Sequence, residues 1–177
     1  MWFRRWFAPR PEPEFEPDPD AEENVRELRR QALTMTAADA GMAQSAVHEE
    51  VWGMLMETAY PEAVATLVAM GDGSTSLYLS NGGGMIGAGA HASVRIATET
   101  FLLVAERHIG AFVPTTEAPL PAIGRVRFYV RTFDGGTLTA EGDPNVLAGG
   151  AHPLAPVYEA GQAVLAAMRE IATHRPA

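Results

Sequence analysis

The stretch that decides the fold is residues 66–92, TLVAMGDGSTSLYLSNGGGMIGAGAHA. Two apolar runs, residues 64–70 and 76–80, lie on either side of the sequence GDGST at 71–75. Glycine takes the positive φ that a tight hairpin connection needs. The stretch therefore predicts strand, turn, strand, and then a glycine-rich loop that leads into a helix.

The glycine-rich loop carries five glycines between positions 82 and 89. Glycine is costly in backbone entropy, so this loop needs an unusual path or a close approach. One interpretation is structural: Asn81-Gly82 is a turn signal, Met85-Ile86 forms a short strand, or two backbones approach closely. The other is an anion-binding nest of backbone N–H groups before a helix. Its candidate ligand-binding residues are Asp72, Ser80, Asn81, Gly82, Gly83, Gly84 and His91.

Nucleotide and metal chemistry are disfavoured by the motifs. Gly82, Gly84 and Gly87 satisfy G-x-G-x-x-G, but dinucleotide folds place this motif after the first strand of a parallel βαβ unit. A Walker-A loop requires lysine, and the chain has none. The five histidines lack ligand spacing, and no pair of carboxylates or nucleophile elbow converges. We therefore expect no cofactor, no metal and no catalytic residue.

Helical signals precede the hairpin. Asp20 is a candidate N-cap, and Glu22 and Glu23 suit the positive end of a helix dipole. An apolar stripe follows, and a second stripe over residues 39–58 predicts more helix, ended by Tyr60-Pro61. The pattern leaves open whether this region is one long helix or two.

A second helix–hairpin–helix unit follows. Residues 90–112 show an amphipathic helical pattern, and residues 154–173 predict the last helix. Between them residues 125–133 alternate as a strand, Asp134-Gly135-Gly136 is a turn, and residues 137–141 return. Only residues 145–148 are left for a fifth strand. The strand's outer face is predicted to meet solvent or an acidic partner through Arg125, Arg127, Tyr129 and Arg131, with Glu141 across the strand to pair with one of the arginines.

These elements predict an α+β domain over residues 21–177. Its antiparallel sheet contains two hairpins, four to five strands in all, packed with three main helices in the order α-β-β-α-β-β-α. Residues 1–20 are predicted to be a disordered tail. Its tip holds Trp2, Phe3, Trp6 and Phe7 around two arginines, and its spacer alternates proline with acids. The tip is expected to be a weak membrane or partner tether, a frayed tail, or a tail that folds back on its own domain.

Composition narrows the partners. The chain of 177 residues has a net charge of −9, which disfavours nucleic-acid binding. The absence of cysteine is compatible with the cytoplasm, where we expect the protein. No apolar run reaches the roughly 20 residues of a membrane-spanning helix.

The order of elements resembles the roadblock/LC7 group of profilin-like folds. The resemblance rests on a first helix over residues 39–58, the hairpin at 64–80, the helix at 90–112 and the closing helix. It implies a non-catalytic homodimeric scaffold with the middle helix in the dimer seam, and protein partners. We therefore expect a small interaction module tethered by its tail; the alternative is a small-molecule or anion sensor, or an enzyme, that uses residues 80–91.

Overall fold

Strand β1 is the centre of a seven-stranded antiparallel sheet with the order β4-β3-β2-β1-β6-β7-β5. The computed structural model describes residues 20–173. The strands are β1 (Val51–Ala59), β2 (Val64–Met70), β3 (Thr75–Leu79), β4 (Gly84–Met85), β5 (Val113–Pro114), β6 (Val126–Thr132) and β7 (Thr137–Gly142). The helices are α1 (Ala21–Thr34), α2 (Ala92–Arg107), α3 (Pro144–Ala148) and α4 (Ala155–Thr173), with short 3-10 turns η1 (Ala88–Ala90) and η2 (Ile109–Ala111).

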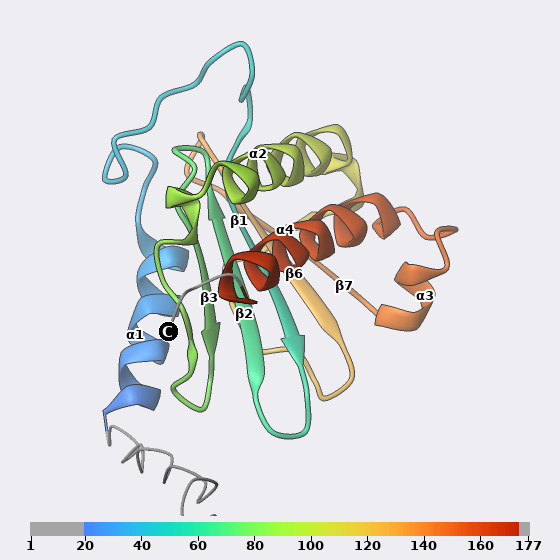
Figure 1. The fold of residues 1–177 in the computed structure, drawn as a ribbon. Helices are drawn as coiled ribbons and strands as arrows, with labels where there is room; N and C mark the ends of the chain where they lie inside the picture. The colour runs from blue at the N-terminus through green and yellow to red at the C-terminus, as the bar shows by residue number, and fades with distance from the viewer. Residues whose placement is uncertain (1–19, 174–177) are drawn as a thin grey trace, which may run out of the picture.

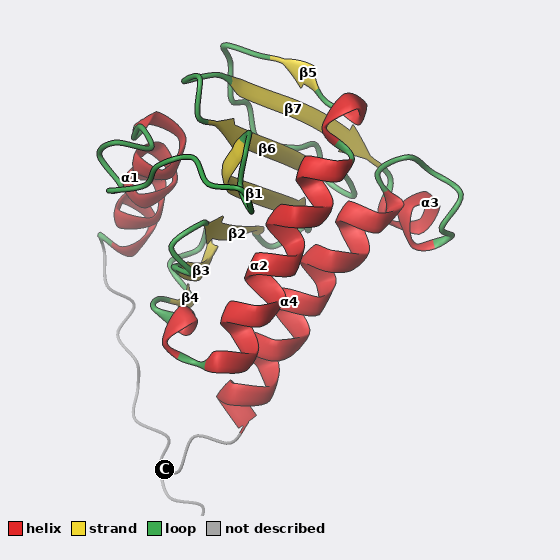
Figure 2. Cartoon of the chain, turned by 90° about the horizontal axis from the view of Figure 1, so that it is seen from above, coloured by secondary structure: helices red, strands yellow, loops and turns green. Residues whose placement is uncertain are grey.

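Helices cover both faces of the sheet. Helices α2 and α4 pack side by side on one face, and α1 lies across the other (Figures 1 and 2). The side facing α2 and α4 holds the larger core, which includes Met54, Phe101 and Phe128. The α1 side holds a smaller cluster that includes Trp52 and Leu55. The predicted α+β class with an antiparallel sheet is confirmed.

The predicted helix over residues 39–58 is wrong, because residues 51–59 form β1. All nine residues of β1 are buried, since β1 has strands on both edges and helices on both faces. A central strand of this kind has apolar residues at nearly every position. Such a run fills a helical stripe as well as it fills a strand, and periodicity alone does not separate the two. Residues 145–148, the stretch left for a fifth strand, belong to α3, which Asp143 caps by accepting from the N–H of Asn145.

The remaining elements agree with the sequence pattern. The hairpin β2–β3, the strands β6 and β7, and the helices α1, α2 and α4 occur within a few residues of their predicted bounds. The short strand predicted at Met85 is present as β4, paired with β3. The tail over residues 1–19 lies outside the described residues.

Helix α1 is fixed to the sheet by a buried ion pair. Arg29 donates from Nε and Nη2 to the two carboxylate oxygens of Glu57, at 2.6 and 2.9 Å. Glu57 is fully buried on β1 and also accepts from the Thr66 hydroxyl at 2.9 Å. Arg29 reaches the carbonyl of Ala118 as well. A buried carboxylate held by two donors is satisfied only while α1 stays in place.

We predict that Arg29→Met lowers the free energy of unfolding by about 3 kcal/mol, because it leaves the Glu57 carboxylate buried without a cation. The double variant Arg29→Met/Glu57→Leu recovers most of this loss. Urea unfolding followed by circular dichroism measures both. The control is Arg30→Met, since Arg30 pairs with Glu27 on the solvent side and surface pairs contribute at most about 1 kcal/mol. Equal losses in the Arg29 and Arg30 variants would contradict the assignment.

Candidate functional site

The candidate ligand-binding residues fall into two groups at opposite ends of β3. Asp72 lies in the turn before β3, and its carboxylate accepts from the N–H and hydroxyl of Ser74 at 2.8 and 3.0 Å. His91 precedes α2, whose 3-10 turn η1 reaches the same end of β3. Ser80 follows β3 at the other end, where its hydroxyl accepts from the N–H of Val64. Asn81, Gly82 and Gly83 follow Ser80 in the turn to β4, and Gly84 is the first residue of β4. The seven residues therefore do not form one site.

The amides of the glycine-rich loop bond within the chain. The N–H of Gly82 donates to the Leu79 carbonyl, and that of His91 donates to Ala88. Gly82, Gly84 and Gly87 have positive φ values of 94°, 147° and 74°. At Gly89 a Cβ atom would lie 2.0 Å from the Gly73 carbonyl oxygen. The glycines are therefore required by the backbone path and its close approach to the β2–β3 turn.

The predicted arginine face of β6 is largely covered. Tyr129 is fully buried and Arg131 is 7 % exposed, because α1 and residues 118–119 lie over them. Arg131 donates to the carbonyls of Leu33 and Met35 at the end of α1, and its guanidinium lies 5.4 Å from the centre of the Trp52 ring. Burial lowers the pKa of Arg131. The expectation that this whole face meets solvent is wrong, because the end of α1 and Pro119 pack against it, a contact with no local sequence signal.

Arg125 and Arg127 are more exposed, but both bind Glu141. The Nε atoms of Arg125 and Arg127 each lie 3.0 Å from a different carboxylate oxygen of Glu141. Burial opposes the charge on Glu141, yet the hydrogen bonds from the two arginines outweigh it and lower the pKa of the carboxyl group. The predicted cross-strand pair is confirmed, and it includes both arginines rather than one. A partner that binds Arg125 or Arg127 would therefore have to compete with Glu141 for that arginine.

A nest of three backbone N–H groups does occur, at a place the sequence did not indicate. The Glu106 carboxylate on α2 accepts from the N–H groups of Glu49, Glu50 and Val51, at 2.9, 3.1 and 3.4 Å. This contact fixes the loop before β1 to α2. The Glu106 carboxylate thus occupies this nest. The nest therefore positions β1 and does not hold a ligand.

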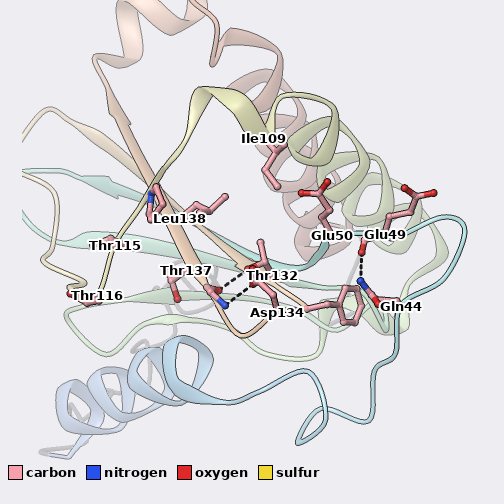
Figure 3. A pocket seen from close by; sticks show the side chains of 13 residues that line it. Gln44, Glu49, Glu50, Ile109, Thr115, Thr116, Thr132, Asp134, Thr137 and Leu138 are labelled. Carbon is pink, nitrogen blue, oxygen red and sulfur yellow. Dashed lines mark hydrogen bonds between the residues drawn. The ribbon is translucent and has the colours of Figure 1, made fainter.

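A hollow of about 680 Å³ lies beside the β6–β7 turn, lined by both polar and apolar side chains (Figure 3). Asp134 at its rim accepts from the Thr132 hydroxyl at 2.6 Å and from the N–H of Gly136 at 2.9 Å, and these bonds lower its pKa. Gln44 donates to the Glu49 carbonyl. Gln44, Thr132 and Asp134 therefore hold the loops on which they lie.

A second hollow is apolar. It has a volume of about 370 Å³ and lies where the last turns of α4 pass over strands β1 to β4. We name it the α4 groove. Its floor consists of sheet residues that point toward the helices: Met56, Thr58, Ala65, Leu67, Leu77 and Leu79. Its walls are the α4 residues Leu165, Met168, Arg169 and Ala172 on one side, and Gly84 and Met85 of β4 on the other, with Tyr60 at one end.

The α4 groove exists because helices α2 and α4 do not cover the β3–β4 edge of the sheet (Figure 2). Leu77 and Leu79 remain half-buried there, whereas Met56 and Leu67 at the centre are almost fully buried. Two large exposed apolar side chains lie at its rim or beside it: Tyr60 is 52 % exposed, and Ile86, next to Met85, is 71 % exposed. An open hollow of this composition favours an apolar occupant.

The nest at Glu106 yields a prediction on the loop before β1. Glu106→Ala removes the acceptor of three N–H groups, so we expect hydrogen exchange of residues 44–51 to rise by about tenfold, as expected for roughly 1–2 kcal/mol of lost local stability. Hydrogen exchange followed by mass spectrometry measures it. Glu99→Ala, on the exposed face of the same helix, is the control. Unchanged exchange in the Glu106 variant would show that the nest does not hold the loop.

Within residues 20–173 no group of three or more His, Asp or Glu side chains is placed to hold a metal ion. In the same range no helix has the length and apolar character to cross a membrane. No protein-family model, curated protein or solved structure matches this chain.

Proposed function

We propose that this protein is a non-catalytic interaction module that binds an apolar segment of a protein in the α4 groove. The observation that carries the proposal is the composition of this groove. Leucine and methionine side chains line it, it is open to solvent, and the one charged side chain among its lining residues is Arg169. Burying apolar surface is the main source of affinity for such a groove.

The polar groups elsewhere support binding rather than catalysis. Glu57 is bound by Arg29 and Thr66, Glu106 by three amides, and Glu141 by two arginines. A catalytic carboxylate needs an open position beside a reacting group. Each of these three carboxylates instead accepts hydrogen bonds from donors of its own domain.

The alternative predicted from the sequence is an anion or small-molecule sensor at residues 80–91. It has less support, because Asp72 and His91 lie at one end of β3 and Ser80 at the other. A homodimer through α2 also has little support from its surface, since Ile96 is the one large, exposed apolar residue of that helix. The roadblock/LC7 resemblance, the homodimer and the cytoplasmic location stay predictions.

The test uses the apolar dye 8-anilinonaphthalene-1-sulfonate as a probe. The protein used is the full chain with four substitutions in its tip: Trp2→Ser, Phe3→Ser, Trp6→Ser and Phe7→Ser. They are needed because aromatic side chains next to Arg4 and Arg5 would bind an anionic dye themselves. We expect saturable fluorescence enhancement with about one dye per chain. Leu79→Glu or Ala172→Glu should weaken binding about tenfold or more, since either places a carboxylate in the groove.

The matched control is Val146→Glu. Val146 is 56 % exposed on α3, away from the β4 edge (Figure 1). Ala172 is exposed in the last turn of α4, so a charge there leaves the core intact if Leu79→Glu fails to fold. Absence of saturable binding, or equal affinity in the groove and control variants, would overturn the proposal.

A further inference from the structure

We infer that the occupant of the α4 groove in the free protein is the aromatic tip of the same chain, residues 1–7. This inference rests on the proposed function, because it takes the groove as a site for apolar side chains. The tip lies outside the described residues. Three observations point to it: the place where the described chain begins, the length of chain before that place, and the chemistry of the two surfaces.

The described chain begins beside the groove. Ala21, the first residue of α1, packs against Gly82 so closely that a Cβ atom on Gly82 would lie 2.5 Å from the Cβ of Ala21. Gly82 lies in the turn between β3 and β4, and two residues later Gly84 lines the groove. The first described residues therefore lie at the β4 edge of the sheet, next to the opening of the groove.

The chain before α1 is long enough to turn around this edge. Twelve residues, 8–19, separate the tip from Asp20, and a chain of that length reaches at most about 40 Å. The path from the α1 side to the α4 side passes one edge strand, and neighbouring strands are about 4.8 Å apart. A tether of this kind holds the tip at an effective concentration of about 1 mM, so a weak contact suffices for docking in the same chain.

The chemistry of the two surfaces is complementary. Trp2, Phe3, Trp6 and Phe7 are large apolar groups that suit a groove lined by Leu77, Leu79 and Leu165. The spacer carries acids at positions 12, 14, 16 and 18. At the rim Arg169 is exposed and has no ion-pair partner within residues 20–173. The acidic spacer thus supplies carboxylates to pair with Arg169 at the rim of the groove. Arg4 and Arg5 extend to water.

The experiment uses a fluorescent label in the groove. The chain has no cysteine, so Ala172→Cys gives a single site for bimane, whose fluorescence a nearby indole quenches. In the full chain we expect the bimane signal to be at least about twofold lower than in the same chain with Trp2→Phe and Trp6→Phe, because phenylalanine keeps the docking and removes the quencher. Trp52 is 1 % exposed on the α1 side of the sheet and is the same in both chains.

Two controls place the contact. The same pair of chains labelled at Val146→Cys should show equal fluorescence, since α3 lies away from the β4 edge (Figure 2). Adding Leu79→Glu to the Ala172-labelled chain should remove the quenching. Quenching must be independent of protein concentration if the tip docks in its own chain. Quenching that rises with concentration would assign the groove to the tip of a second copy and overturn the inference.

The outcomes separate the inference from the proposed function. Equal bimane signals with and without the two indoles, together with saturable dye binding in the groove, would overturn docking of the tip and leave the interaction module standing. Absence of both the bimane quenching and the saturable dye binding would overturn both the docking of the tip and the proposed interaction module. Quenching at Ala172 that survives Leu79→Glu would show that the tip lies near α4 but outside the groove, which also contradicts the inference.

Discussion

The structure depends on the burial of β1 on both of its faces. A strand with β2 and β6 on its edges must have its apolar side chains covered from both sides. Helices α2 and α4 cover one side, and α1 covers the other. Because Glu57 lies on the α1 side, the cover there must also bring a cation, which Arg29 supplies. The position of α1 is thus fixed by charge as well as by apolar contact.

The incomplete cover on the α2 and α4 side produces the candidate site. Helix α4 passes over the centre of the sheet, where Gly161 allows close packing against Met56 and Phe101. Its last turns leave the β3–β4 edge uncovered, and the α4 groove lies there. On the α1 side the polar side chains of β6 are instead bound by α1, by Pro119 and by Glu141. The apolar α4 groove therefore lies at one edge of the sheet.

The local elements could be predicted from the sequence because their signals are local. Gly71-Asp72-Gly73 and Asp134-Gly135-Gly136 mark turns between strands, and the stripes of α2 and α4 have helical spacing. Strand β1 could not be told from a helix, since a strand buried on both faces has no alternation. That error left the role of Glu57, a buried carboxylate on β1, unpredicted. The pairing of Arg29 with Glu57, and of Glu106 with residues 49–51, joins segments far apart in the chain and has no short-range signal.

In the candidate site, too, features with a local sequence signal could be predicted and features made by tertiary packing could not. Of the two interpretations of the glycine-rich loop, positive φ at Gly82, Gly84 and Gly87 supports the backbone requirement. The groove that Gly84 helps to line could not be derived, because it arises only when α4 meets the sheet. The alternation over residues 125–131 separates the two faces of β6, but the covering of the arginine face by α1 depends on tertiary packing.

The most direct test is nuclear magnetic resonance of the full chain with labelled leucine and methionine methyl groups. If the α4 groove is a binding surface for apolar segments and the tip fills it, the methyl protons of Leu79 and Leu165 show nuclear Overhauser contacts to tryptophan ring protons that vanish on Trp2→Ser/Trp6→Ser substitution. The contrary result is that these methyl groups contact only the neighbours seen in the fold and do not respond to a peptide of residues 1–7 added in excess.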